Sequence, residues 1–223
     1  MNITNEKVTD YIVSFYQPWN DTMRKLRAQS EADQIPLILK ETEMLFRTLL
    51  PLRPVHRVLE IGTAYGYSSI FFAHLLPESR ITTVELSDTN YQVAVDNIWE
   101  QGLTDRIQVI HGDGSVVLEE LIQDAGTGNE EPFDLIFIDA AKSHYMEFFE
   151  KAEKLCSKDA LIVCDNILMK AFLVDSSLDR KRRHRTSVKR MNEFLEYVHS
   201  RADLEVSLLS CGDGLLLIKE NKK

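Results

Sequence analysis

The sequence predicts an α/β fold in which helices cover both faces of a doubly wound, mainly parallel sheet. From residue 56 onward, short runs rich in Val, Ile, Leu and Phe alternate with stretches of helical periodicity. The last two apolar runs are instead separated only by a tight glycine-containing turn, which is typical of a hairpin. We therefore expect the final strand to enter the sheet antiparallel.

The bulk composition is that of one globular domain. The chain has 223 residues, of which 44% are hydrophobic and 27% are charged. A chain of this length buries roughly 70% of its unfolded surface, so it needs no disulfides to fold. We expect a single domain over residues 1–223, with N-terminal helices over 1–50 and an α/β core over 51–223.

The N-terminal region is predicted to form three helices, because apolar residues recur there at helical spacing. Asp21 is the expected N-cap of the second helix. Pro36 suits the first turn of the third helix, and Pro51 should end it. The predicted helices span residues 8–16, 21–33 and 35–50.

Seven strands and five further helices complete the expected fold. The first five strands are continuous apolar runs, which indicates burial on both faces. The predicted strands span 56–62, 80–86, 107–113, 133–140, 160–166, 204–211 and 214–220. The helices span 67–76, 90–102, 115–125, 144–156 and 180–201, and the last of them carries Val188, Met191, Leu195 and Val198 on one face.

Several features favour a cytoplasmic protein. No run of about 18 apolar residues exists, so no membrane span is expected, and the N-terminus lacks the pattern of a secretory signal. We interpret Cys156, Cys164 and Cys211, an odd number without a CxxC pair, as buried reduced thiols. The formal net charge of −9 argues against broad nucleic-acid binding, although it permits a local basic patch.

Acidic residues follow or end three successive predicted strands around a glycine-rich turn. The turn "VLEIGTAYGYSS" has the spacing Gly62-x-x-x-Gly66, so it lacks the GxGxxG pattern of dinucleotide enzymes. Glu60 suits a ligand's ammonium, Glu85 suits ribose hydroxyls, and Asp113 suits an adenine amino group. S-adenosylmethionine fits this set and NAD fits it poorly. The alternative is a purely structural turn with unrelated acids, but the coincidence at one sheet edge favours a ligand.

A second group of polar residues ends the fourth and fifth predicted strands. Asp139, Asp165 and Asn166 should converge at the carboxyl edge of the sheet. Their oxygens suit Mg²⁺, Mn²⁺ or Ca²⁺, whereas a lone Asp would more often be a cap or turn residue. Lys142, three residues after Asp139, would be disfavoured as a cation beside such an ion, which would help it act as a base. The alternative is a solvent-facing loop lysine.

Six motifs in this order resemble the cation-dependent O-methyltransferases, a family that includes the catechol and caffeoyl-CoA enzymes. The motifs are "VLEIGTAYGYSS", "VELSDTNYQVAVDNI", "GDG", "FDLIFIDAAKSHY", "LIVCDNIL" and the terminal "GDGLLL". The resemblance covers about residues 35–219 and implies a class I methyltransferase (Rossmann-like) sheet. It implies catalytic roles for Lys142 and Asp139, and a Mg²⁺ (or Mn²⁺ or Ca²⁺) site at Asp139, Asp165 and Asn166. The implied S-adenosylmethionine contacts are Ile38, Glu60, Gly62, Ser68, Glu85, Asp113, Gly114 and Asp139.

A narrower resemblance concerns the substrate. The segments "IPLILKETEMLFRTLL", "AAKSHYMEFF" and "DRKRRHRTSVKR" resemble the bacterial tRNA 5-hydroxyuridine methyltransferases, which produce 5-methoxyuridine at the wobble position of the anticodon loop. A basic run alone is more often a solvated helix face. Here it begins a helix, where cations oppose the macrodipole, so stability gives no reason for it. The implied tRNA contacts are Arg180, Lys181, Arg182, Arg183 and Arg185.

The sequence therefore favours a tRNA-modifying O-methyltransferase, with a small-phenol enzyme of catechol or caffeoyl-CoA type as the alternative. An NAD-dependent oxidoreductase and a non-catalytic RNA-binding module fit less well. The first lacks its glycine fingerprint, and the second does not explain the Asp139, Asp165, Asn166 and Lys142 set. By analogy with relatives we expect a homodimer.

Overall fold

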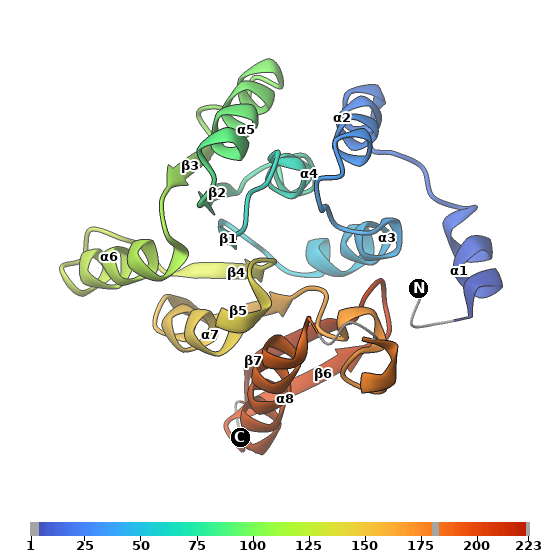
Figure 1. Cartoon of the computed structure of the whole chain (residues 1–223). Coiled ribbons are helices and arrows are strands. Elements are labelled where there is room, and N and C mark those ends of the chain that lie inside the picture. The colour runs from blue at the N-terminus through green and yellow to red at the C-terminus, as the bar shows by residue number, and fades with distance from the viewer. Residues whose placement is uncertain (1–4, 180–182, 222–223) are drawn as a thin grey trace.

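A seven-stranded sheet with helices on both faces forms the protein (Figure 1). The computed structural model describes residues 5–179 and 183–221. The strand order is β3-β2-β1-β4-β5-β7-β6, and β7 runs antiparallel to both of its neighbours. The strands are β1 (Arg57–Ile61), β2 (Arg80–Glu85), β3 (Ile107–His111), β4 (Phe133–Ile138), β5 (Cys156–Cys164), β6 (Leu204–Leu209) and β7 (Leu215–Glu220). The predicted doubly wound sheet with a reversed last strand is confirmed.

The helices divide into two layers. In Figure 1, α6, α7 and α8 lie on one side of the sheet, while α2, α3, α4 and α5 lie on the other. The α-helices are α1 (Glu6–Val13), α2 (Asp21–Ala32), α3 (Lys40–Leu49), α4 (Tyr67–Leu75), α5 (Asp88–Glu100), α6 (Gly114–Gly126), α7 (Tyr145–Glu153) and α8 (Arg185–Ser200). Short 3₁₀ turns are η1 (Leu50–Leu52), η2 (Lys142–His144), η3 (Met169–Ala171) and η4 (Ser176–Leu178).

Each central strand contributes to two separate cores, because successive side chains of a strand point to opposite faces. On β4, Ile136 and Ile138 pack in the core beneath α6, α7 and α8. Leu135 and Phe137 of the same strand pack in the core beneath α2, α3 and α4. This two-sided burial explains why the strands read as continuous apolar runs.

Local details differ from the sequence prediction at several helix ends. The N-cap of α2 is Asn20, whose side chain accepts from the backbone N–H of Met23 at 2.8 Å, and Asp21 is the first helical residue. Pro36 does not begin α3, because residues 35–39 lie outside the helix. The carbonyl of Ile38 in this segment accepts a hydrogen bond from Arg27 Nη2 at 3.1 Å. Helix α3 therefore begins at Lys40, later than the predicted start at residue 35.

The C-terminal half shows three further differences. Cys156 belongs to β5 rather than to the preceding helix, since it pairs with Phe133 of β4. Of the three cysteines only Cys164 is buried; Cys156 and Cys211 are partly exposed, and all three are free thiols. In α8 the residues fully buried are Met191, Phe194 and Val198, so the predicted apolar face is right but omitted Phe194. Among the described residues, no helix has the length and apolar character needed to cross a membrane.

Candidate active site

Asp139 and Asp165 lie at one edge of the sheet because the strands before them are in register. Ile138 of β4 is paired with Cys164 of β5, so the next residue of each strand is an aspartate at the carboxyl edge. The backbone N–H of Asp165 continues this pairing by donating to the carbonyl of Ile138 at 3.0 Å. Asn166 follows directly and adopts a left-handed backbone with φ of 55°.

Lys142 joins these residues through its ammonium group. Its Nζ donates to Asp139 Oδ1 at 3.1 Å and to Asn166 Oδ1 at 3.0 Å. A third hydrogen bond, of 2.9 Å, runs to the hydroxyl of Tyr145. The side chain of Lys142 is 24% exposed, so it can exchange partners with a ligand. The ammonium thus stands between two of the three predicted metal ligands, where another cation would compete with it.

Tyr145, which the sequence analysis did not single out, anchors this arrangement. It is 1% exposed and donates its hydroxyl hydrogen to the backbone carbonyl of Asp165 at 2.8 Å. Burial, with a smaller contribution from Asp139, raises the pKa of Tyr145 well above its usual value, so it stays a hydrogen-bond donor. Its position three residues after Lys142 was the available sequence signal.

Asp165 carries an unpaired oxygen. The residue is 1% exposed, and its Oδ1 accepts from the backbone N–H of Asn166 at 2.7 Å. Its Oδ2 is buried without a hydrogen-bond partner among the described residues. Burial, together with the charge of Asp139, raises the pKa of Asp165 well above that of an ordinary carboxyl. A buried carboxylate in this state is costly unless a cation pairs with it.

The donor set fits a hard divalent cation. Asp139, Asp165 and Asn166 offer two carboxylates and an amide oxygen, and Mg²⁺, Mn²⁺ and Ca²⁺ prefer such oxygens. Among residues 5–179 and 183–221, no group of three or more His, Cys, Asp or Glu side chains forms a metal-binding cluster. Any ion held here would therefore depend on the amide of Asn166.

The glycine-rich turn after β1 presses against the backbone of Asp139. Ile61 pairs with Ile138, which places Gly62 beside Asp139. Gly62 has a φ of +105°, and a Cβ built on it would lie 2.1 Å from the carbonyl oxygen of Asp139. Only glycine tolerates both conditions. The predicted cofactor turn and the predicted metal residues therefore meet at this point.

Glu60 lies beneath the turn and is fully buried. Its carboxylate accepts hydrogen bonds from the hydroxyls of Ser68 and Ser69 and from Thr83 Oγ1, the last at 2.6 Å. Burial outweighs these donors and raises the pKa of Glu60 to about 7. Through Ser68 and Ser69, Glu60 fixes the first turn of α4. A direct contact of Glu60 or Ser68 with a cofactor stays a prediction.

Glu85 and Asp113 lie at the ends of the neighbouring strands. Glu85 accepts from the backbone N–H of Ala64 at 2.7 Å and of Ser87 at 2.9 Å, so it fixes the same turn. Asp113 is exposed and caps α6, accepting from the backbone N–H of Ser115 at 2.8 Å. Both acids keep the places that the strand pattern implied, and their ligand contacts stay predictions.

The remaining predicted cofactor residues are Gly114 and Ile38. Gly114 is the first residue of α6 and is partly buried. Ile38 is 1% exposed and belongs to the core beneath α2, α3 and α4. Its side chain is therefore a core residue in this structure, and its predicted cover over the cofactor stays untested.

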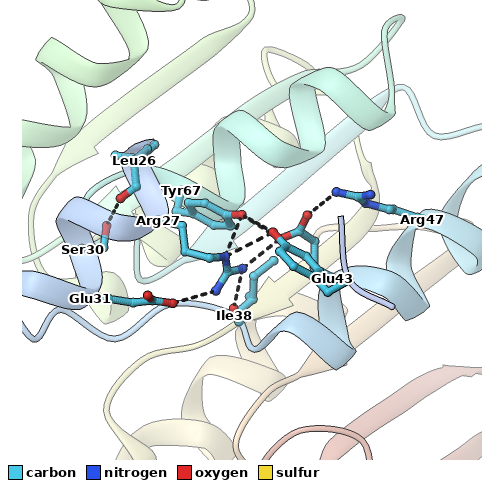
Figure 2. A network of polar contacts seen from close by, with 9 residues as sticks. Leu26, Arg27, Ser30, Glu31, Ile38, Glu43, Arg47 and Tyr67 are labelled. Carbon is cyan, nitrogen blue, oxygen red and sulfur yellow. Dashed lines mark hydrogen bonds and ion pairs between the residues drawn. The ribbon is translucent and has the colours of Figure 1, made fainter. Parts of the chain in front are cut away.

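A buried polar cluster around Glu43 fixes the N-terminal helices to the cofactor turn (Figure 2). The carboxylate of Glu43 is 0% exposed and accepts from Arg27 at 2.8 Å, Tyr67 at 2.6 Å and Tyr16 at 2.8 Å, with Arg47 as a fourth donor. Tyr67 is the first residue of α4, directly after the glycine-rich turn. The cluster therefore joins α2 and α3 to the helix that starts at this turn. The sequence analysis did not predict it.

The basic run is only partly described. Arg180, Lys181 and Arg182 lie outside the described residues. Arg183 and Arg185 are exposed, and Arg185 is the first residue of α8. The predicted position at the start of a helix is therefore right for the described part.

Two contacts place this start of α8 near the active site. The ring of His184 stacks on Phe172, in the loop that follows Asn166, with a centroid distance of 5.2 Å. Further along the helix, Arg190 Nη1 donates to the carbonyl of Ser143 at 3.1 Å, next to Lys142. The exposed arginines thus belong to a segment that borders both loops of the site.

A protein-family model described as O-methyltransferase matches residues 14–221 of the chain. Among curated proteins, a catechol O-methyltransferase of Niastella koreensis is 39% identical over 121 residues, which are 54% of this chain and 53% of that protein. The chain thus spans about half the length of that relative. Caffeoyl-CoA O-methyltransferase 1 of Eucalyptus globulus is 30% identical over 176 residues, which are 77% of this chain and 69% of that protein.

Solved structures agree with these matches. The O-methyltransferase TomG of Streptomyces achromogenes, crystallised in complex with SAM and involved in tomaymycin synthesis, superposes with a TM-score of 0.80. It is 26% identical, and the match covers 96% of each chain.

Proposed function

This chain belongs to the O-methyltransferase family, and we propose that it transfers a methyl group from S-adenosylmethionine to a hydroxyl of a small phenol with two adjacent oxygens. A divalent cation would assist the transfer. The named relatives act on catechol or caffeoyl-CoA, which supports this substrate class over the tRNA substrate favoured by the sequence alone. The SAM-bound structural relative supports the choice of methyl donor.

The observation that carries the proposal is the arrangement of Asp139, Asn166 and Lys142. The Nζ of Lys142 lies 3.1 Å from Asp139 Oδ1 and 3.0 Å from Asn166 Oδ1. Asp165 adds a buried carboxyl oxygen without a hydrogen-bond partner among the described residues. A catechol edge presents two neighbouring oxygens, which could bind one cation together. With an ion bound, the site would offer a cation and, in the neutral amine of Lys142, a proton acceptor at the same place.

Asp139, Asp165 and Asn166 would hold the ion, whose charge would lower the pKa of the substrate hydroxyl. In the structure Lys142 donates to Asp139 and Asn166 as an ammonium. With an ion bound to these two oxygens the ammonium would be disfavoured, and the resulting neutral amine would take up or relay the proton of the hydroxyl. Methyl transfer to the hydroxyl oxygen would form an O–C bond and break the C–S bond of the sulfonium, with S-adenosylhomocysteine as the leaving group. Tyr145 keeps Lys142 in position through its 2.9 Å hydrogen bond.

Positioning of the two reactants is the second contribution of the chain. The turn at Gly62 contacts the backbone of Asp139, so the proposed cofactor and cation sites share one residue. Holding the methyl donor and the hydroxyl at adjacent points replaces an encounter in solution, which can supply much of the rate.

The second candidate substrate is a tRNA 5-hydroxyuridine, whose 5-hydroxyl and neighbouring O4 also form a pair of adjacent oxygens. The exposed Arg183 and Arg185 beside the site favour it, because cationic side chains at a site's border suit a phosphate backbone. The same chemistry would then act on a larger substrate.

The deciding experiment is methyl transfer with labelled S-adenosylmethionine and Mg²⁺, offered either catechols and caffeoyl-CoA or tRNA lacking the 5-methoxy group. We expect label in the small phenols, with activity little affected by salt. Label only in tRNA, with binding that weakens steeply as salt rises, would select the second candidate. Absence of label from both would contradict the proposal. The homodimer and the cytoplasmic location stay predictions.

A further inference from the structure

The loop that follows Asp165 has an unusual backbone. Asn166, Met169, Lys170 and Ala171 have φ angles of 55°, 49°, 56° and 66°. These are four of the six non-glycine residues with positive φ in the described parts of the chain. Residues with a side chain rarely adopt this conformation, and it persists only where the surroundings impose it. Some other segment must therefore hold residues 166–171 in place.

That segment is the "GDG" turn between β6 and β7. Backbone N–H groups of Ile167 and Leu168 donate to the carbonyls of Gly214 and Asp213 at 2.9 and 3.0 Å. The carboxylate of Asp213 accepts from the backbone N–H of Lys170 at 2.6 Å. Gly214 has a φ of +89°, and a Cβ built on it would lie 2.5 Å from Leu168 Cγ and 2.7 Å from its nitrogen. The two loops therefore pack so closely that no side chain fits at position 214.

The side chain of Asp213 is not needed to close its own hairpin. The turn is closed by the backbone N–H of Gly214, which donates to the carbonyl of Cys211 at 3.0 Å. A turn residue with no outside role would direct its carboxylate to its own backbone or to water. Instead, Asp213 Oδ1 accepts a hydrogen bond from the backbone N–H of Lys170, 43 residues earlier in the chain.

Asp213 also lies within electrostatic range of the site without joining its ligands. The charge of Lys142 lowers the pKa of Asp213, although burial raises it more, and Asp213 contributes to the raised pKa of Asp165. Yet Asp139, Asp165 and Asp213 do not form a three-acid cluster among the described residues. Asp213 thus interacts with the site electrostatically, while its Oδ1 is bonded to the backbone N–H of Lys170.

We propose that Asp213 is a positioning residue of the cation site, holding the strained loop 166–171 so that Asn166 presents its amide oxygen beside Asp139 and Asp165. This inference rests on the cation-dependent function proposed above. Asn166 reaches Lys142 from a left-handed backbone, and a loop released at Lys170 would relax away from that conformation. The ion would then lose one of its three protein ligands.

The test is direct binding of Mn²⁺ to the purified full chain, followed by electron paramagnetic resonance. Asp213→Ala is expected to weaken Mn²⁺ binding by about 10- to 100-fold, the usual effect of removing a residue that orients a metal ligand. Affinity for S-adenosylhomocysteine, measured by calorimetry, should change by less than about twofold, because the glycine-rich turn is fixed by Glu60 and Glu85 instead.

Two further variants separate positioning from charge. Asp213→Asn keeps an oxygen that can accept from Lys170, so Mn²⁺ affinity should return to within about threefold of the unaltered protein. Glu205→Ala makes the same charge change on an exposed position of the same hairpin and should have no effect. If Asp213→Ala does not fold, Asp213→Glu replaces it, since it keeps the charge but displaces the acceptor.

Each outcome decides something. Unchanged Mn²⁺ affinity in a folded Asp213→Ala or Asp213→Glu overturns the inference while leaving the proposed function intact. Equal losses in Asp213→Asn and Asp213→Ala would show that charge, rather than the bond to Lys170, matters, and would also overturn it. Failure of the unaltered protein to bind Mn²⁺ would remove the proposed cation-dependent function, and this inference with it.

Discussion

Two buried carboxyl groups, Glu43 in α3 and Asp165 directly after β5, have opposite surroundings. Glu43, 0% exposed, has four side-chain donors from Arg27, Arg47, Tyr16 and Tyr67 (Figure 2). Asp165, 1% exposed, has one backbone donor for one oxygen and no partner among the described residues for the other. Asp165 Oδ2 is the one carboxyl oxygen among the five buried side-chain atoms that lack a partner in the described residues. Because buried carboxyl oxygens are usually satisfied, this one indicates a place for a cationic ligand.

The backbone follows the same division. Glu43 belongs to the regular helix α3, whereas Asp165 leads into a loop with four left-handed non-glycine residues. Strain of that kind collects at functional sites because the rest of the fold supplies the stability that it costs. The Glu43 cluster therefore stabilises the fold, whereas the arrangement around Asp165 depends on support from the surrounding fold.

Glu43→Ala should lower the stability of the protein more than any other change considered. Removing the carboxylate leaves Arg27, whose side chain is 7% exposed, as a buried charge with only the more distant, exposed Glu31 as an ionic partner among the described residues. We expect the free energy of unfolding to fall by about 3–5 kcal/mol, measured in urea. The control is Glu31→Ala, since Glu31 pairs with the same arginine at 3.8 Å but is 53% exposed; its loss should stay below about 1 kcal/mol. Similar losses in both variants would contradict the structural role of the cluster.

Glu60 is a third buried carboxyl group, and its raised pKa makes stability depend on pH. Because its folded pKa of about 7 lies above the ordinary glutamate pKa of 4.5, the folded state binds the proton more tightly than the unfolded state. The resulting stability is complete below about pH 4.5 and is lost as pH rises through 7.

Glu60→Gln removes that loss. At pH 8 the variant should be more stable than the unaltered protein by up to about 3 kcal/mol, and the difference should vanish near pH 4. Urea unfolding across this pH range measures it, with the exposed Glu78→Gln as the control. A constant difference at every pH would show that Glu60 ionises normally beneath the turn.

Asp165→Asn should have the smallest effect on stability and a large one on activity. The amide can still accept from the backbone N–H of Asn166, and it replaces a carboxyl whose ionisation is disfavoured by burial and by Asp139. We expect the unfolding free energy without metal to stay within about 1 kcal/mol or to rise. Methyl transfer should fall by about 100-fold or more, because a cation ligand is lost. A loss of stability comparable to that of Glu43→Ala would erase the distinction between the two clusters.

The convergence of the candidate catalytic residues was more predictable than the Glu43 cluster. Asp139, Asp165 and Asn166 follow strands whose apolar runs are unmistakable, and parallel strands end at one edge, so their convergence could be read from the chain. Lys142 could be placed because it is three residues from Asp139. Proximity along the sequence or a shared sheet edge was the signal in every case.

The structural side could not be predicted in that way. Arg27 and Glu43 look like surface charges of amphipathic helices, and only the packing of α2 on α4 buries them together. Asp213 was recognised only as part of a turn, because its bond to Lys170 joins segments 43 residues apart. Pairing across such distances depends on which loops the finished sheet brings into contact.

The sequence by itself determined the doubly wound sheet, the reversed last strand, the family and the edge at which the acids collect. The sheet, its reversed strand and this edge follow from hydrophobic periodicity, turn chemistry and strand direction, which are local properties. The family was implied by the resemblance of six motifs. The tertiary structure alone decided which carboxylates are satisfied and which is left free. That outcome depends on burial and on donors from distant segments, and neither Glu43 nor Asp165 carries a local mark of it.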